Sequence, residues 1–220
     1  MRSLQTLLAS GAVALATVVA LPARAQMPGL PVLQNAFANP GLTGGAVYGH
    51  QDGADAYGAA GSWAPGSGWF QLTAGVGALR AAGETGLTGG ARGSVSLGKF
   101  LSFLRRESFG ATAFVGGGLA KQGGATSRTL PLGIGLGYRR MLGSRVISGY
   151  VAPYYSRFKL TGVDPAPDAK WLFRGSVGVD ISVFSTMGLT VGWEGGAKAG
   201  EGELGPRGSV FGIGLSYALH

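Results

Sequence analysis

Few residues in this chain could carry acid–base or metal chemistry. It has two histidines, His50 and His220, and no cysteine, which excludes disulfides and thiolate metal sites. His50 precedes Asp52 by two residues, and such a pair can serve as a general base and its orienting group. Three further acidic residues could join it by position: Asp55, Glu84 and Glu194. The two histidines lack metal-ligand spacing. We therefore expect a solvated loop at His50 and a protein that is not an enzyme.

Glycine dominates the composition, with 43 of 220 residues, beside 45% hydrophobic and 13% charged residues. The glycine runs 116–118 and 133–137 could suggest a dinucleotide loop, but such a loop must open a helix. No helical pattern follows either run, so we expect no cofactor. The formal charge of +8 could indicate nucleic acid. The basic residues are scattered without interleaved aromatics, which argues against a nucleic-acid partner.

The first residues are typical of an export signal. Arg2 is followed by an apolar stretch over 7–21 and by Ala23-Arg24-Ala25, a small-x-small cleavage site ahead of Gln26. The stretch is shorter than the roughly 20 residues of a membrane helix. We predict a cleaved signal peptide at 1–25, and hence an exported protein.

The rest of the chain alternates with a period of two, which indicates strands. Bulky apolar residues occupy every second position in 130–138 and 211–219, and in 171–183 except at Gly175; the positions between are mostly glycine, serine or charged residues. A soluble sandwich would bury the bulky face in a core. A membrane barrel would turn it to lipid and keep the small or polar face in the lumen. The length of the segments, mostly 9 to 14 residues, favours the barrel over the shorter strands of soluble sheets.

The alternation predicts an all-β, antiparallel up-and-down transmembrane barrel at 42–220, after an N-terminal periplasmic or lumenal segment at 26–41. Ten strands fit best, and eight remain if the two weakest are dropped. The predicted strands are 42–50, 55–64, 68–80, 88–99, 109–120, 128–139, 146–159, 170–183, 187–195 and 207–219. Connections after odd strands are polar and predicted to be longer outer loops. The others are predicted to be short periplasmic turns, except for an amphipathic interfacial turn at 99–108.

Four charged residues fall on the small-residue face of their strands: Arg92, Arg174, Asp180 and Glu194. Unpaired charges inside a narrow barrel cost several kcal/mol each. We therefore predict that these two basic and two acidic side chains form a polar network in the lumen. The sequence leaves open whether that network closes the lumen or borders a narrow water-filled path.

The last strand carries the most specific resemblance. Ile213, Leu215, Tyr217 and Leu219 alternate in a pattern that resembles the C-terminal assembly signal of outer-membrane barrels, although Leu219 replaces the usual aromatic and His220 follows it. The whole mature chain resembles the small bacterial outer-membrane β-barrel proteins, the OmpA/OmpX-like group. That resemblance implies an outer-membrane location, contact with outer-membrane lipid, and the barrel-assembly machinery as a partner during biogenesis.

A second resemblance covers Asn39-Pro40-Gly41-Leu42, which is similar to the segment that opens the barrel in the long-chain fatty-acid transporter family; Gly41 replaces the alanine usual there. A plain turn explains the same residues. The expected function is a structural, interaction or narrow-conduit role in the outer membrane. The alternative is transport of hydrophobic small molecules, with a small hydrophobic ligand. A lumenal segment within 26–41, or an apolar opening between strands, would favour that alternative.

Overall fold

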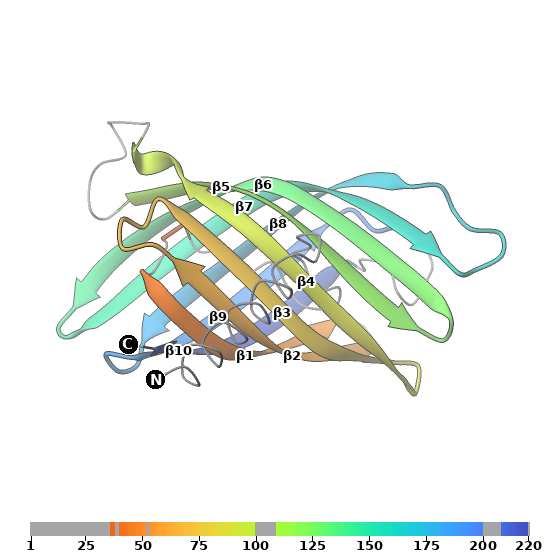
Figure 1. Ribbon diagram of the computed structural model, residues 1–220, viewed down its shortest axis with the longest axis horizontal. Helices are drawn as coiled ribbons and strands as arrows, with labels where there is room; N and C mark the ends of the chain where they lie inside the picture. Colours follow the sequence, from red (N-terminus) through yellow and green to blue (C-terminus); the bar gives the residue numbers. More distant parts are fainter. Residues whose placement is uncertain (1–35, 38–39, 52, 100–108, 200–207, 220) are drawn as a thin grey trace, which may run out of the picture.

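The computed structural model describes residues 36–37, 40–51, 53–99, 109–199 and 208–219. Ten antiparallel strands form a closed barrel, with β1 paired to β10 (Figure 1). The strands are β1 (Gly41–Gln51), β2 (Ala54–Ala64), β3 (Phe70–Ala81), β4 (Glu84–Ser96), β5 (Phe109–Gln122), β6 (Ala125–Leu142), β7 (Arg145–Thr161), β8 (Lys170–Ser182), β9 (Met187–Gly196) and β10 (Ser209–Leu219). The predicted ten-stranded up-and-down barrel is confirmed.

The described part of the chain contains one short helical element, the 3₁₀ turn η1 (Leu97–Lys99). No helix in these ranges has the length and apolar character needed to cross a membrane.

The start of β1 and the end of β10 lie at the same end of the barrel, called here the terminal end (Figure 1). The hairpins β1–β2, β3–β4, β5–β6 and β7–β8 lie at the opposite end, called the far end. Consecutive strands pair as antiparallel neighbours throughout, so each residue shares its face of the sheet with the Cα partners on both sides.

The far-end connections β1–β2, β3–β4, β5–β6 and β7–β8 are all shorter than predicted, most of all the second and the third. β4 begins at Glu84 directly after the turn Ala82-Gly83, and β6 begins at Ala125 directly after Gly123-Gly124. Gly83 and Gly124 adopt φ values of +82° and +84°, which glycine tolerates without steric cost and which tight hairpins require. The polar residues predicted to form loops at 81–87 and 121–127 instead extend the strands. The predicted interfacial turn at 99–108 lies almost entirely outside the described residues.

The outer face of the barrel is apolar. Leucine, isoleucine, valine and aromatic side chains at alternate positions are exposed, including Leu132, Leu136, Val177 and Ile213. Outward aromatic side chains also contact each other across neighbouring strands, as Phe109 and Tyr138 do with ring centroids 4.9 Å apart. A face of this kind is far larger than the apolar patches of soluble monomers, and it matches the lipid-facing band of a membrane barrel.

The inner face has two unlike sides. The small-residue wall is the inner face of β10, β1, β2 and β3, whose described inward positions hold no charged or aromatic residue. The charged wall is the inner face of β4 to β9. Its large or charged inward residues include Arg92, Phe114, Arg139, Tyr150, Tyr154, Phe158, Lys170, Leu172, Arg174, Asp180 and Glu194.

Candidate functional site in the barrel lumen

The centre of the charged wall is an ion pair between β8 and β9. Arg174 Nε donates to Glu194 Oε1 at 2.8 Å, and both side chains are at most 2% exposed. A second guanidinium nitrogen of Arg174, Nη1, donates to the carbonyl oxygen of Ala197 at 2.8 Å. Gly196 permits this approach, because a Cβ there would lie 2.7 Å from the Arg174 Cα. The pair neutralises two charges that would each be costly alone in this environment.

Asp180 lies nearer the terminal end and has its own hydroxyl partners. Ser148 of β7 donates to its Oδ2 at 3.4 Å, and Thr190 of β9 donates to its Oδ1. Asp180 therefore sits on the inner face, bridged to both neighbouring strands, but with different partners from the Arg174–Glu194 pair. The predicted network of four charged residues therefore includes hydroxyl partners that the sequence did not indicate.

Arg92 lies on β4, on the other side of the aromatic residues of the charged wall. Its guanidinium carbon is 5.8 Å from the ring centroid of Phe114, and that ring in turn packs against Tyr154 at 6.1 Å between centroids. Gly133 makes room for both rings, since a Cβ at this position would lie 2.3 Å from the Tyr154 Cβ. Cationic, aromatic and ion-paired groups therefore form a continuous layer from β4 to β9.

A cavity of about 480 Å³ occupies the terminal end of the lumen. Its lining includes the charged side chains Arg92, Arg139 and Asp180 and the hydroxyl side chains Thr43, Ser62, Thr73, Ser148, Ser182, Ser185, Thr186, Thr190 and Ser216. Hydroxyls from β1, β2, β3 and β10 thus face the charged residues across the cavity. The volume falls in the range of roughly 300–1,000 Å³ typical of small-molecule sites.

Two residues that precede β1 lie in the lumen, and Phe37 lines this cavity. Ala36 is buried, and it lies with Phe37 against the inner glycines Gly110 and Gly137, where an added Cβ would come within 3 Å of one or both. The Arg139 guanidinium carbon lies 4.6 Å from the Phe37 ring centroid. This part of the predicted 26–41 segment is therefore lumenal. Asn39 lies outside the described residues, so the fatty-acid transporter resemblance stays a prediction.

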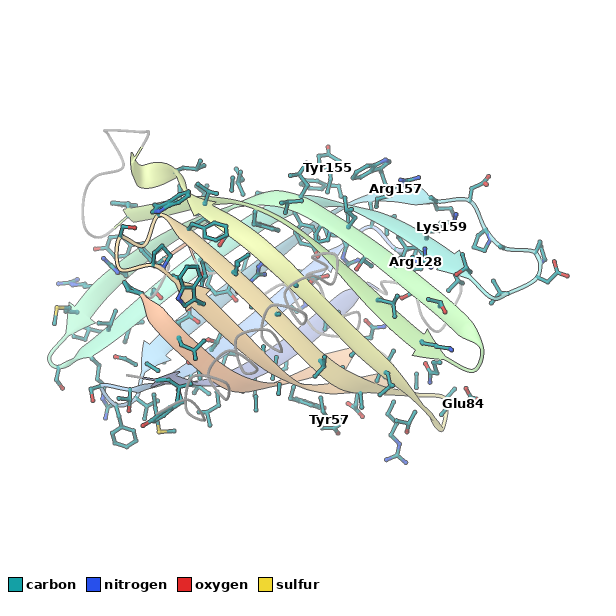
Figure 2. The ribbon with its side chains drawn as sticks, viewed as in Figure 1. Tyr57, Glu84, Arg128, Tyr155, Arg157 and Lys159 are labelled. Atoms are coloured by element: carbon teal, nitrogen blue, oxygen red, sulfur yellow. The ribbon has the colours of Figure 1, made fainter. Side chains whose placement is uncertain are left out.

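The residues considered for acid–base chemistry do not form one cluster. His50 Nδ1 lies 2.8 Å from Asp55 Oδ1, and Tyr48 donates to the same oxygen at 2.8 Å, all on the outer face of the β1–β2 hairpin. Glu84 instead lies at the β3–β4 turn, beside Gly123 (Figure 2). Asp52 lies outside the described residues. Among the described residues, no group of three or more His, Asp or Glu side chains could hold a metal.

The residues of the predicted assembly signal all point outward. Ile213, Leu215, Tyr217 and Leu219 are exposed on β10, next to β1 and β9. Their position at the barrel closure agrees with the pattern read from the sequence, and their role in assembly stays a prediction.

Sequence reasoning missed several lumen residues. Tyr150, Tyr154 and Phe114 were not placed in the lumen from the sequence alone, although each occupies an inward position between small residues. Their inward position could have been predicted from the sequence, because a bulky aromatic residue on a glycine-rich face needs space on the neighbouring strand. Gly133 and Gly178 provide that space. Arg139 could also have been found from its inward parity. Phe37 could not, because no strand pattern covers it.

No protein-family model matches the chain, and no curated protein matches it either. Among solved structures, the beta domain of the Bordetella autotransporter Brka is 13% identical, with 81% of this chain and 99% of that chain covered and a TM-score of 0.52. The KdgM porin is 11% identical, with 81% and 99% covered and a TM-score of 0.38. The first likeness confirms the predicted resemblance at the level of the fold, that of outer-membrane β-barrels.

Proposed function

We propose that the protein is an integral barrel of the bacterial outer membrane whose lumen acts as a narrow conduit for small polar solutes and ions. The observation that carries this proposal is the cavity of about 480 Å³ at the terminal end, whose lining combines hydroxyl and charged side chains from both walls with apolar residues such as Phe37 and Met187. The exposed apolar outer face supports membrane insertion, and an even number of strands puts both ends of the barrel domain on the periplasmic side.

We expect the route to be narrowest where the charged wall carries its largest side chains. Arg174, Glu194 and Tyr154 project from one side, while the opposite small-residue wall offers glycine and alanine such as Gly58 and Ala60. Small inner residues on a ten-stranded barrel leave width that bulky residues would fill. We therefore expect a low conductance controlled by the side chains of both walls.

A pair of adjacent positions tests this directly. Ala60 faces the lumen and its neighbour Ala59 faces outward, as their Cα partners Gly45 and Ala46 do. We expect Ala60→Trp to lower the single-channel conductance of the purified barrel in planar bilayers, because the indole occupies the lumen. Ala59→Trp is the matched control and leaves it unchanged. An unboiled gel band that shifts on boiling verifies folding of each variant. No conductance from the wild-type barrel would contradict the conduit.

Transport of hydrophobic small molecules is the second candidate, because Ala36 and Phe37 lie inside the lumen. The charged and hydroxyl side chains that share the cavity lining with Phe37 favour polar solutes instead. A detergent-solubilised barrel that binds a fluorescent fatty acid and does not conduct ions would favour this second candidate.

A further inference from the structure

We propose that the outer face of β5, β6 and β7 binds the phosphate groups of an anionic lipid at the far end of the barrel. The site is a cationic patch formed by Lys121, Arg128, Arg157 and Lys159. This inference rests on the proposed membrane location, and it is independent of whether the lumen conducts.

The four side chains share one face and one level of the barrel. Arg128 of β6 and Lys159 of β7 are direct Cα partners, and Arg157 follows on the same face of β7. Lys121 of β5 has Thr126 as its Cα partner, two residues before Arg128. All four are exposed. Figure 2 shows Tyr155, Arg157 and Lys159 in succession toward the far end, with Arg128 beside Lys159.

The patch lies where the lipid headgroups would be. β6 and β7 contain 18 and 17 residues, longer than the roughly 9–11 that a tilted strand needs to cross the hydrocarbon. Along the outer face of β6, the stretch between Arg128 and Arg140 is uncharged, as 130–138 hold Leu130, Leu132, Ile134, Leu136 and Tyr138. The basic residues therefore begin where the apolar band ends.

Aromatic side chains mark the same boundary. Tyr155 and Phe173 are outward Cα partners with ring centroids 5.2 Å apart, and the next outward pair toward the far end is Arg157 and Trp171. Aromatic residues concentrate at the interface between hydrocarbon and headgroups. The sequence along β7 thus passes from aliphatic to aromatic to cationic within one face.

The protein itself does not neutralise this charge. None of the four cations has an ion pair with another described residue, and no outward position of β5 to β8 in the described ranges holds an acidic residue. Asp164 and Asp168 follow in the β7–β8 loop, and neither of them forms an ion pair there. Like charges at directly opposed positions, as in Arg128 and Lys159, destabilise a sheet. A phosphate bound between them would remove that repulsion with charge-assisted hydrogen bonds.

The occupant that fits is a phosphorylated glycolipid such as lipid A, whose phosphates lie at the headgroup level of the outer leaflet and whose acyl chains would cover the apolar band below. Continuity between the cationic patch and the lipid-facing surface favours a lipid over a free anion. A soluble anion would gain nothing from Leu130, Leu132 and Val151 beneath the patch.

Native mass spectrometry of the folded, detergent-solubilised full chain, titrated with lipid A, tests the proposal. We expect one molecule of lipid A to bind per barrel at low lipid concentration. The triple variant Arg128→Gln, Arg157→Gln, Lys159→Gln should bind lipid A with an affinity at least about ten-fold lower. The matched control Arg80→Gln, Arg140→Gln, Arg145→Gln removes the same charge elsewhere and should bind within about two-fold of wild type.

Two further arms identify the source of the phosphate. Dephosphorylated lipid A should bind as weakly as lipid A binds the triple variant, and inorganic phosphate should compete poorly. Equal loss in both triple variants, undiminished binding of dephosphorylated lipid, or full competition by inorganic phosphate would each overturn the proposal. Because binding is read without ion flux, its failure is distinguishable from failure of the conduit.

Discussion

The two walls of the lumen use the same backbone architecture with opposite side-chain strategies. The small-residue wall, on β10 and β1 to β3, is lined by small or uncharged side chains. The charged wall, on β4 to β9, packs aromatic rings into spaces left by glycine and ties two buried charges together at 2.8 Å. One side of the barrel therefore carries the charges and the large rings, while the other carries small or uncharged side chains, several of which are buried in a cluster that includes Ala56 and Leu79.

The largest effect is expected from breaking the ion pair of the charged wall. Glu194→Ala leaves the Arg174 guanidinium buried without its carboxylate, and we expect a loss of about 3–5 kcal/mol in the free energy of unfolding. Urea titration of the barrel in lipid vesicles, followed by tryptophan fluorescence, measures this. Glu84→Ala, at the exposed β3–β4 turn, is the control with little effect.

A double variant sharpens the same point. Replacing both partners by apolar residues of similar size, Arg174→Met with Glu194→Leu, should recover most of the lost stability, since no unpaired charge remains. If the double variant is as unstable as Glu194→Ala, the ion pair contributes more to the free energy of unfolding than is needed to offset the cost of burying its two charges.

The second effect concerns glycine on the charged wall. Gly133→Val places a Cβ within 2.3 Å of the Tyr154 Cβ, and overpacking of this kind costs typically about 1–3 kcal/mol. Gly44→Val, on the outer face of β1, meets nothing within 4 Å and serves as the control. Equal unfolding midpoints for the two variants would contradict the tight packing described for the charged wall.

A smaller effect is expected where the N-terminal residues meet the charged wall. Arg139→Gln removes the cation that lies 4.6 Å from the Phe37 ring centroid, an interaction worth about 0.5–1 kcal/mol at partly exposed sites. Hydrogen exchange at Gly110 and Gly137, compared between wild type and variant, should show faster exchange only near this contact. Unchanged exchange at both glycines would contradict a role for the contact between Arg139 and Phe37 in holding the N-terminal residues in the lumen.

The charges of the cavity also predict a direction of ion selectivity. Arg92 and Arg139 face the terminal cavity with Asp180 as the acidic member of its lining. Fixed charges along a pore select ions of opposite sign. Asp180→Asn should therefore raise the preference for anions in reversal-potential measurements across a salt gradient, and Arg139→Gln should lower it. Shifts of the opposite sign would place the conducting path away from this cavity.

The alternating pattern was sufficient to predict the barrel and the inward side of Arg92, Arg174, Asp180 and Glu194. This works because a period of two is a local property: one strand alone determines which side chains share a face. The contacts of Arg174 with Glu194 and of Asp180 with Thr190 depend on the register between β8 and β9, which no single strand encodes.

The turn lengths were predicted less well, for a physical reason. Polarity marks where the apolar band ends, whereas strands continue as long as their backbone groups pair. β4 therefore includes Glu84 and Thr85, which pair with Ala81 and Arg80 although neither is apolar. Phe37 was missed because its position depends on the space left by Gly110 and Gly137 on other strands.

The central claim is that one face of each strand meets lipid and the other meets the lumen. Since the chain has no cysteine, single spin labels at Gly61→Cys and Ser62→Cys report on neighbouring outward and cavity-lining positions of β2. In bilayers, we expect the label at position 61 to be accessible to apolar oxygen, and the label at position 62 to a water-soluble nickel chelate. If the label at 61 is shielded from both reagents, its face lies in a protein core and the membrane barrel is contradicted.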